Sequence, residues 1–148
     1  MKTFVGAMIS LALLTMTAPV SADETPPCAQ TVLSGRYACS FEGQPLTITV
    51  ERKGDQITLA TQLAGSREDR ESYVADGVRR VSASGTGRID EYAATCRQKS
   101  IRIEYFVGDE PVARSALTLE RVPNGMVWNM VRDDGTVRLN CTRNRGRS

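Results

Sequence analysis

The sequence predicts an all-β protein: an antiparallel meander of about 8–10 strands that closes or curls into an up-and-down β-barrel. Apolar residues recur at every second position over most of the chain, which is typical of half-buried strands. Turn-forming pairs such as Asp76-Gly77 and Asn124-Gly125 interrupt these runs at short intervals, as in hairpins. No stretch beyond the first 22 residues shows a sustained helical period. A two-sheet β-sandwich is the alternative, since strand spacing does not exclude Greek-key crossovers.

Residues 1–22 have the pattern of a cleaved secretory signal peptide. Lys2 supplies an early positive charge, an apolar run extends from Phe4 to Met16, and Ala22 precedes the expected cut. The predicted localisation is therefore periplasmic or secreted. The run is too short to span a bilayer unaided, and no later stretch is apolar enough to do so, so we expect no transmembrane segment.

Removal of this segment leaves 126 of the 148 residues, enough for one domain with a single modest core. Residues 23–34 form a polar, Pro-rich leader, residues 35–143 the single barrel domain, and residues 144–148 a basic tail. The remaining 18 Lys and Arg against 17 Asp and Glu give a net charge of +1. This balance does not favour a nucleic-acid partner.

Alternation and turns place the strands in order along the chain. Leu46, Ile48 and Val50 alternate with polar residues, and the same pattern recurs at Ile101 and Ile103, so each strand should have one dry and one wet face. Gly-containing turns separate the runs. The expected strands are 35–42, 45–52, 56–63, 70–75, 78–83, 91–97, 100–107, 112–122, 126–132 and 136–143.

All four cysteines lie beyond the predicted cut, in a compartment where disulfides persist. They are Cys28, Cys39, Cys96 and Cys141. Four cysteines allow three pairings, and the sequence does not choose among them. Cys39, Cys96 and Cys141 fall on inward positions of their strands, which indicates structural disulfides. No two cysteines are two to four residues apart and the chain has no histidine, so no metal site is predicted.

The chain shows no constellation of catalytic residues, and we expect neither enzymatic activity nor a cofactor. Histidine, the commonest general base, is absent. Adjacent acids suited to glycoside hydrolysis occur in predicted turns, where acidic residues are common for structural reasons. These pairs are Glu68-Asp69, Asp109-Glu110 and Asp133-Asp134.

Trp128 is flanked at strand spacing by Met126 and Met130. Inside a barrel, an aromatic ring and two adaptable thioethers suit the lining of a small apolar cavity. The alternative is that these three residues fill the core of a protein with only 5% aromatic residues.

The segment Tyr37-x-Cys39-x-Phe41-x-Gly43, followed by the alternating run 46–50, resembles the opening of the periplasmic and membrane-associated inhibitors of C-type lysozyme. Those proteins are small, exported, disulfide-linked β-barrels. Residues 81–85, with Tyr92 further on, look like that family's Ser-Gly-x-x-Tyr loop, which is implicated in occupying the lysozyme cleft. The resemblance implies a partner-binding set of Ser82, Ser84, Gly85, Arg88 and Tyr92.

The sequence therefore favours an exported, non-enzymatic binding protein that acts through hairpin loops. A protein partner is expected, and the resemblance implies a hydrolase such as lysozyme, which the protein would inhibit. Two alternatives stay open: a lipocalin-like carrier with a small apolar ligand near Trp128, and a structural envelope protein.

Overall fold

The computed structural model describes residues 33–81 and 90–144, and within these ranges all regular elements are strands. The ten strands form one sheet in the order β4-β3-β2-β1-β10-β9-β8-β7-β6-β5, with every ladder antiparallel. They are β1 (Gly35–Phe41), β2 (Gln44–Lys53), β3 (Gln56–Leu63), β4 (Asp69–Val74), β5 (Arg80–Val81), β6 (Asp90–Arg97), β7 (Ser100–Val107), β8 (Ser115–Val122), β9 (Gly125–Arg132) and β10 (Gly135–Arg143). The predicted antiparallel meander is confirmed, and the two-sheet alternative is wrong.

Two predicted strands differ from the observed ones. The run 112–122 begins only at Ser115, because Pro111 has no N–H to donate and Val112 is 74% exposed, outside the core. The run 78–83 contributes only the short β5, and residues 82–89 lie outside the described residues.

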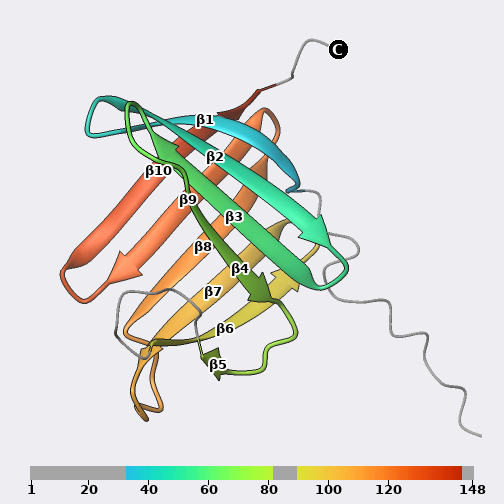
Figure 1. Cartoon of the computed structure of the whole chain (residues 1–148), viewed down its shortest axis with the longest axis vertical. Coiled ribbons are helices and arrows are strands. Elements are labelled where there is room, and N and C mark those ends of the chain that lie inside the picture. The colour runs from blue at the N-terminus through green and yellow to red at the C-terminus, as the bar shows by residue number, and fades with distance from the viewer. Residues whose placement is uncertain (1–32, 82–89, 145–148) are drawn as a thin grey trace, which may run out of the picture.

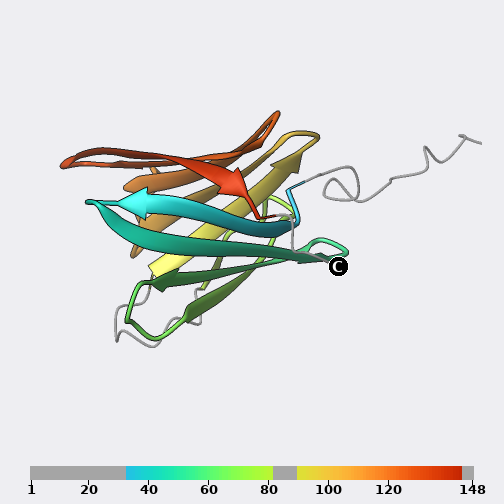
Figure 2. The same ribbon diagram turned by 90° about the horizontal axis from the view of Figure 1, so that it is seen from above.

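The sheet curls so that its two halves face each other. Figures 1 and 2 show β1–β4 forming one wall, β6–β10 the other, and the two sets of strands crossing diagonally. The first and last strands, β1 and β10, pair directly. The meander is therefore closed on itself at this side of the barrel.

The opposite side of the barrel, between β4 and β6, is joined mainly by side chains and a few hydrogen bonds. The ring of Tyr73 on β4 meets the ring of Tyr92 on β6 edge-on, with centroids 5.1 Å apart. The Val74 N–H donates to the Tyr92 hydroxyl at 3.0 Å, and the Gly77 N–H donates to the Ala94 carbonyl at 2.8 Å. Among the described residues, β4 and β6 therefore share no ladder, whereas β1 and β10 are paired, Tyr37 with Arg143 and Ala38 with Thr142.

A disulfide reinforces the ladder between β1 and β10. Cys39 and Cys141 are bonded, with Cα atoms 4.3 Å apart, and both are buried, as their inward positions predict. Cys96 on β6 is also disulfide-bonded and buried. Cys28 lies outside the described residues.

The core fills most of the barrel interior. Its fully buried members include Leu33, Tyr37, Ile48, Ile57, Ile101, Ile103, Leu117, Leu119 and Met126. The Tyr37 hydroxyl donates to the Leu33 carbonyl at 2.6 Å. Leu33 was expected in the leader 23–34, but it packs as a core residue because its side chain is apolar and its carbonyl has a partner inside the barrel.

The ends of the described chain lie together. The Asn144 N–H donates to the Arg36 carbonyl at 2.8 Å, so the predicted tail 144–148 begins with a residue that is still bonded to β1. Residues 145–148 and the predicted signal peptide, 1–22, lie outside the described residues.

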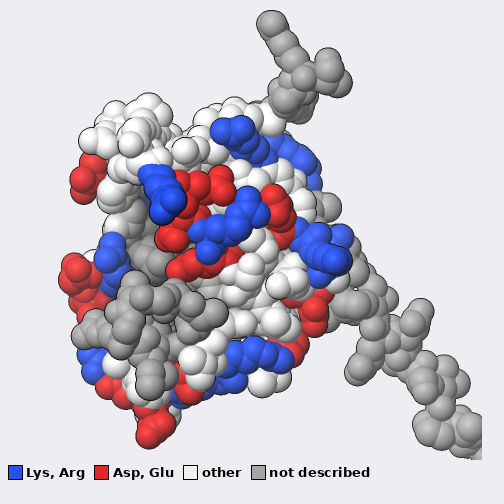
Figure 3. All heavy atoms as spheres, in the orientation of Figure 1, with Lys and Arg blue, Asp and Glu red and all other residues white. Residues whose placement is uncertain are grey.

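The outer surface carries both signs of charge. Figure 3 shows Lys and Arg intermingled with Asp and Glu on the face of β2–β4. Arg70, for example, lies 3.3 Å from Glu51 and 3.2 Å from Glu68, with all three side chains exposed. Such pairs contribute roughly 0–1 kcal/mol each. Among the described residues, no helix is long and apolar enough to cross a membrane.

Candidate functional site

One end of the barrel interior is hollow. A cavity of about 210 Å³ lies between β3, β4, β7, β8 and β9. An apolar cavity of about 150 Å³ already accommodates benzene, so this volume suits a small organic molecule. The residues that line it are Leu59, Thr61, Asp69, Glu71, Tyr73, Tyr105, Leu117, Trp128 and Met130.

A second hollow of about 340 Å³ adjoins the first and shares Glu71, Tyr105 and Met130 with it. It continues along the ends of β7 and β8, over Phe106, Val107, Arg114 and Ser115. Trp128 and Met130 are only partly buried although they pack against the core, whereas Leu59 and Leu117 in the same lining are buried. The interior is therefore open on this side.

Strand alternation and register place the lining side chains. Leu117 on β8 is opposite Met130 on β9, and Leu119 is opposite Trp128, so these positions share the inner face. On β4, residues 69, 71 and 73 are opposite 61, 59 and 57 of β3. The inner face of β4 therefore presents two acids followed by a tyrosine.

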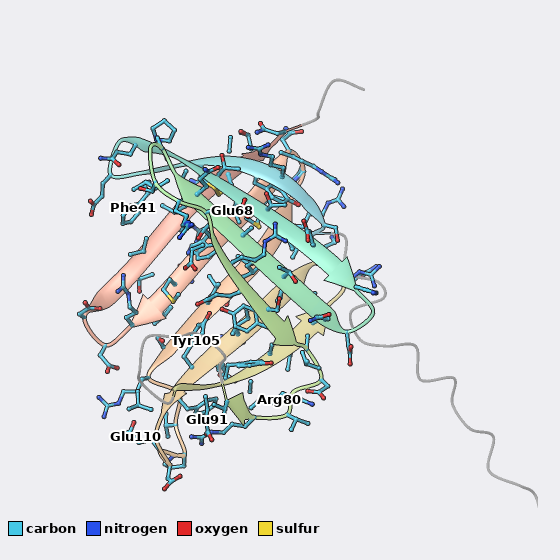
Figure 4. The ribbon with its side chains drawn as sticks, viewed as in Figure 1. Phe41, Glu68, Arg80, Glu91, Tyr105 and Glu110 are labelled. Atoms are coloured by element: carbon cyan, nitrogen blue, oxygen red, sulfur yellow. A yellow bond between two sulfur atoms is a disulfide. The ribbon has the colours of Figure 1, made fainter. Side chains whose placement is uncertain are left out.

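A hydrogen-bonded cluster forms the polar side of the cavity. The Tyr73 hydroxyl donates to Glu71 Oε2, and the hydroxyl oxygens of Tyr73 and Tyr105 are 2.9 Å apart. Because Tyr73 has a single proton and gives it to Glu71, Tyr105 is the donor in the second bond. Figure 4 shows Tyr105 lying between the two walls of the barrel.

Burial keeps both phenols protonated. Desolvation is the main cause that raises the pKa of Tyr105 to about 12. Desolvation also raises the pKa of Tyr73, and the neighbouring Tyr105 and Glu71 raise it further. The carboxyl groups of Asp69 and Glu71 therefore supply the negative charge of this cavity.

The Arg114 side chain in the larger hollow is paired with the Glu110 carboxylate. Arg114, in the lining of the larger hollow, donates from Nε and Nη2 to both oxygens of Glu110, at 2.7 and 2.5 Å. This bidentate pair raises the pKa of Arg114 and lowers the pKa of Glu110. Asp133 lies 3.8 Å from the same guanidinium. Within the part of the chain that the structure describes, the lining of the smaller cavity contains neither Lys nor Arg.

The structure separates the three residues predicted to line a cavity. Trp128 and Met130 line the hollow, whereas Met126 is fully buried and packs as core. Asp69 was expected in a turn with Glu68, but it is the first residue of β4 and faces the cavity. Asp133 and Asp134 do lie in a turn.

The predicted partner-binding set falls mostly outside the described residues, which exclude Ser82, Ser84, Gly85 and Arg88. Tyr92 is a correction. It is only 5% exposed, since its ring packs against Tyr73, and so it offers no surface to a partner. The resemblance to lysozyme inhibitors stays a prediction.

Sequence reasoning missed the polar half of the cavity. A signal was present in the spacing of Asp69, Glu71 and Tyr73, which are two residues apart and so share one strand face. The partner of this face, Tyr105, is 32 residues beyond Tyr73 and comes close only through the curl of the sheet. In the ranges 33–81 and 90–144, no group of three or more His, Cys, Asp or Glu side chains could hold a metal ion.

No family model matches the chain, and no curated protein does either. Solved structures do resemble it. The fatty acid transporter REP1-NXSQ has a TM-score of 0.61 at 12% identity, over 77% of this chain and 97% of that one. Human cRBP IV has a TM-score of 0.61 at 12% identity, over 76% and 98%. A Schistosoma mansoni fatty acid binding protein in complex with arachidonic acid has a TM-score of 0.61 at 13% identity, over 80% and 98%.

The chain shares their β-barrel fold. At such low identities the likeness shows the fold alone. By their names, the transporter and the fatty acid binding protein are proteins that bind or transport small molecules.

Proposed function

We propose that this protein is a non-enzymatic carrier that binds a small apolar ligand in the hollow end of its barrel. The observation that carries the proposal is the cavity of about 210 Å³ with Leu59, Leu117, Trp128 and Met130 on its walls. Mostly apolar walls with a few polar groups at defined positions are typical of small-molecule sites. The binding and transport proteins that share the fold support the same proposal.

We further propose that the carrier acts outside the cytosol, in the periplasm or in the extracellular medium. The signal-like pattern of residues 1–22 and the Cys39–Cys141 disulfide support this location, because such bonds persist in oxidising compartments. Detection of the mature protein in periplasmic and culture fractions of the source cell tests it.

Trp128 is the single tryptophan of the chain, and it lies in the cavity wall, so its emission reports occupancy. A panel of apolar molecules, with 1-octanol and benzene as the first probes, should change the Trp128 emission saturably. The same ligands should raise the melting temperature, since a ligand at 100 times its Kd adds about 2.7 kcal/mol to the free energy of unfolding. If no ligand changes either quantity, the carrier proposal is wrong.

A pair of variants on β3 locates the bound ligand. Thr61→Phe places a ring in the cavity and should weaken ligand binding at least tenfold, by occupying the volume the ligand needs. Thr58→Phe makes the same change on the outer face, where Thr58 contacts Ser72, and should leave affinity unchanged. Equal affinities for the two variants would place the ligand elsewhere.

A further inference from the structure

The two phenol donors of the cavity, Tyr73 and Tyr105, are already in use. Tyr105 donates to Tyr73, and Tyr73 donates to Glu71, so both phenol protons point along the cluster toward the carboxylate. What the cluster still offers a ligand is acceptors: the remaining lone pairs of Glu71 and those of the Tyr105 oxygen. Thr61 adds a hydroxyl that is able to donate or accept.

The charge of the cavity also favours a ligand that donates hydrogen bonds and carries a positive charge. Asp69 and Glu71 both lie in the lining, and none of the described residues that line it is a Lys or an Arg. Arg114 is the cation of the adjoining hollow, and its fork is bonded to both oxygens of Glu110. A ligand carboxylate would therefore meet two like charges, and the Arg114 guanidinium in the adjoining hollow is already paired with Glu110.

A ligand ammonium would instead find complementary groups. It carries only donors, and the cluster presents acceptors with a negative charge. The rings of Tyr73, Tyr105 and Trp128 line the same space, and aromatic faces attract cations. Leu59, beside Glu71 on the same wall, and Leu117 and Met130 on the opposite wall suit an apolar body.

From this arrangement we infer that the ligand of the cavity is an apolar amine, whose ammonium group binds at Glu71 with Asp69 beside it. The inference rests on the proposed carrier function and specifies its ligand class. It separates this chain from the fatty acid binding protein that shares its fold and is named with arachidonic acid. The fold is common to both, whereas the polar groups of this cavity suit the opposite charge.

Three ligands with one chain length test the inference on the intact protein. Octylamine, 1-octanol and octanoate are titrated at neutral pH while the emission of Trp128 and the heat of binding are followed. Octylamine should bind at least about tenfold more tightly than octanoate, as expected for one charge-assisted hydrogen bond. The alcohol should fall between them.

Glu71→Gln keeps the shape of the side chain and an acceptor for Tyr73 but removes the charge. It should weaken octylamine at least about tenfold and change 1-octanol little. Glu68→Gln is the matched control, because Glu68 is an exposed acid that pairs with Arg70 on the outer surface. If Glu71→Gln does not fold, Asp69→Asn is the second variant. It should weaken octylamine binding about threefold, because it removes the carboxylate that lies beside the proposed ammonium site.

The outcomes distinguish this inference from the carrier proposal. Octanoate binding as tightly as octylamine overturns the amine assignment and leaves a carrier. Equal octylamine affinities for Glu71→Gln and Glu68→Gln also overturn it. If none of the three ligands binds, the carrier proposal falls and the amine assignment falls with it.

Discussion

Met126 and Met130 lie four residues apart on the same face of β9, yet Met126 is fully buried and Met130 lines a hollow. Met126 belongs to the buried core together with large side chains such as Leu33 and Tyr37, both at most 1% exposed. Met130 is only partly buried, as are Tyr105 and Trp128 in the same lining, which also contains two acids. The same strand and residue type therefore contribute to the packed core at one position and to the lining of a cavity at the other.

Truncating each methionine tests whether Met126 and Met130 differ in packing, and it should give the largest effect. Met126→Ala should lower the free energy of unfolding by about 2–5 kcal/mol, since it leaves a void in packed core. Met130→Ala should cost about 1 kcal/mol or less, because the side chain borders space that is already empty. Urea unfolding of the two variants measures both values. Equal losses would show that the two ends are packed alike.

Removing the Cys39–Cys141 disulfide tests how much the covalent link between β1 and β10 contributes to the free energy of unfolding and to ligand binding. Cys39→Ala combined with Cys141→Ala should lower the free energy of unfolding by about 2–4 kcal/mol, because the bond closes a long loop of 102 residues. Ligand affinity of the folded variant should stay unchanged. The control pair Ser40→Ala and Thr142→Ala alters the outer face of the same strands and should cost about 1 kcal/mol or less. A larger loss from the control pair contradicts this view.

The smallest expected effect is a dependence of stability on alkaline pH that arises at the hollow end. Folding raises the pKa of Tyr105 from 10.0 to about 12, so the folded protein favours the neutral phenol. Its contribution to stability is complete below pH 10 and is lost as pH rises toward 12. Urea midpoints measured below pH 10 and near pH 12 should fall less in Tyr105→Phe than in the native protein. An identical fall in both would exclude Tyr105 as a source.

Most of the fold follows from local patterns in the sequence. Alternation at Leu46, Ile48 and Val50 predicts β2, and the same reasoning puts the cysteines on inward positions, because a dry face and a wet face leave a period-two record. Turn residues fix where strands end. The edge strand β5 is predicted less well, since it has only two residues and is too short to show a period.

The cavity could be predicted only in its apolar half. Trp128 and Met130 can be predicted as cavity residues because their side chains are large and apolar. Asp69 and Glu71 cannot, because in the sequence they look like solvent-exposed acids, and only the curl of the sheet places them at the cavity. On β4 the face that points into the barrel carries two acids, Asp69 and Glu71. The alternation of apolar and polar residues that marks an inner and an outer face is therefore missing there. The contact between Tyr73 and Tyr105 depends on the closure of the sheet, which no local pattern records.

The pairing of β1 with β10 makes the first and last strands of the meander neighbours. The described chain begins and ends at one place, where Asn144 is bonded to Arg36 (Figure 1). Around the barrel, almost every strand lies next to the strand that follows it in the sequence. The gap between the chain ends therefore occupies a position like that of any hairpin turn. Because the ends of the described chain lie close together, we expect the fold to tolerate circular permutation, with new ends at the exposed turn around Gly65.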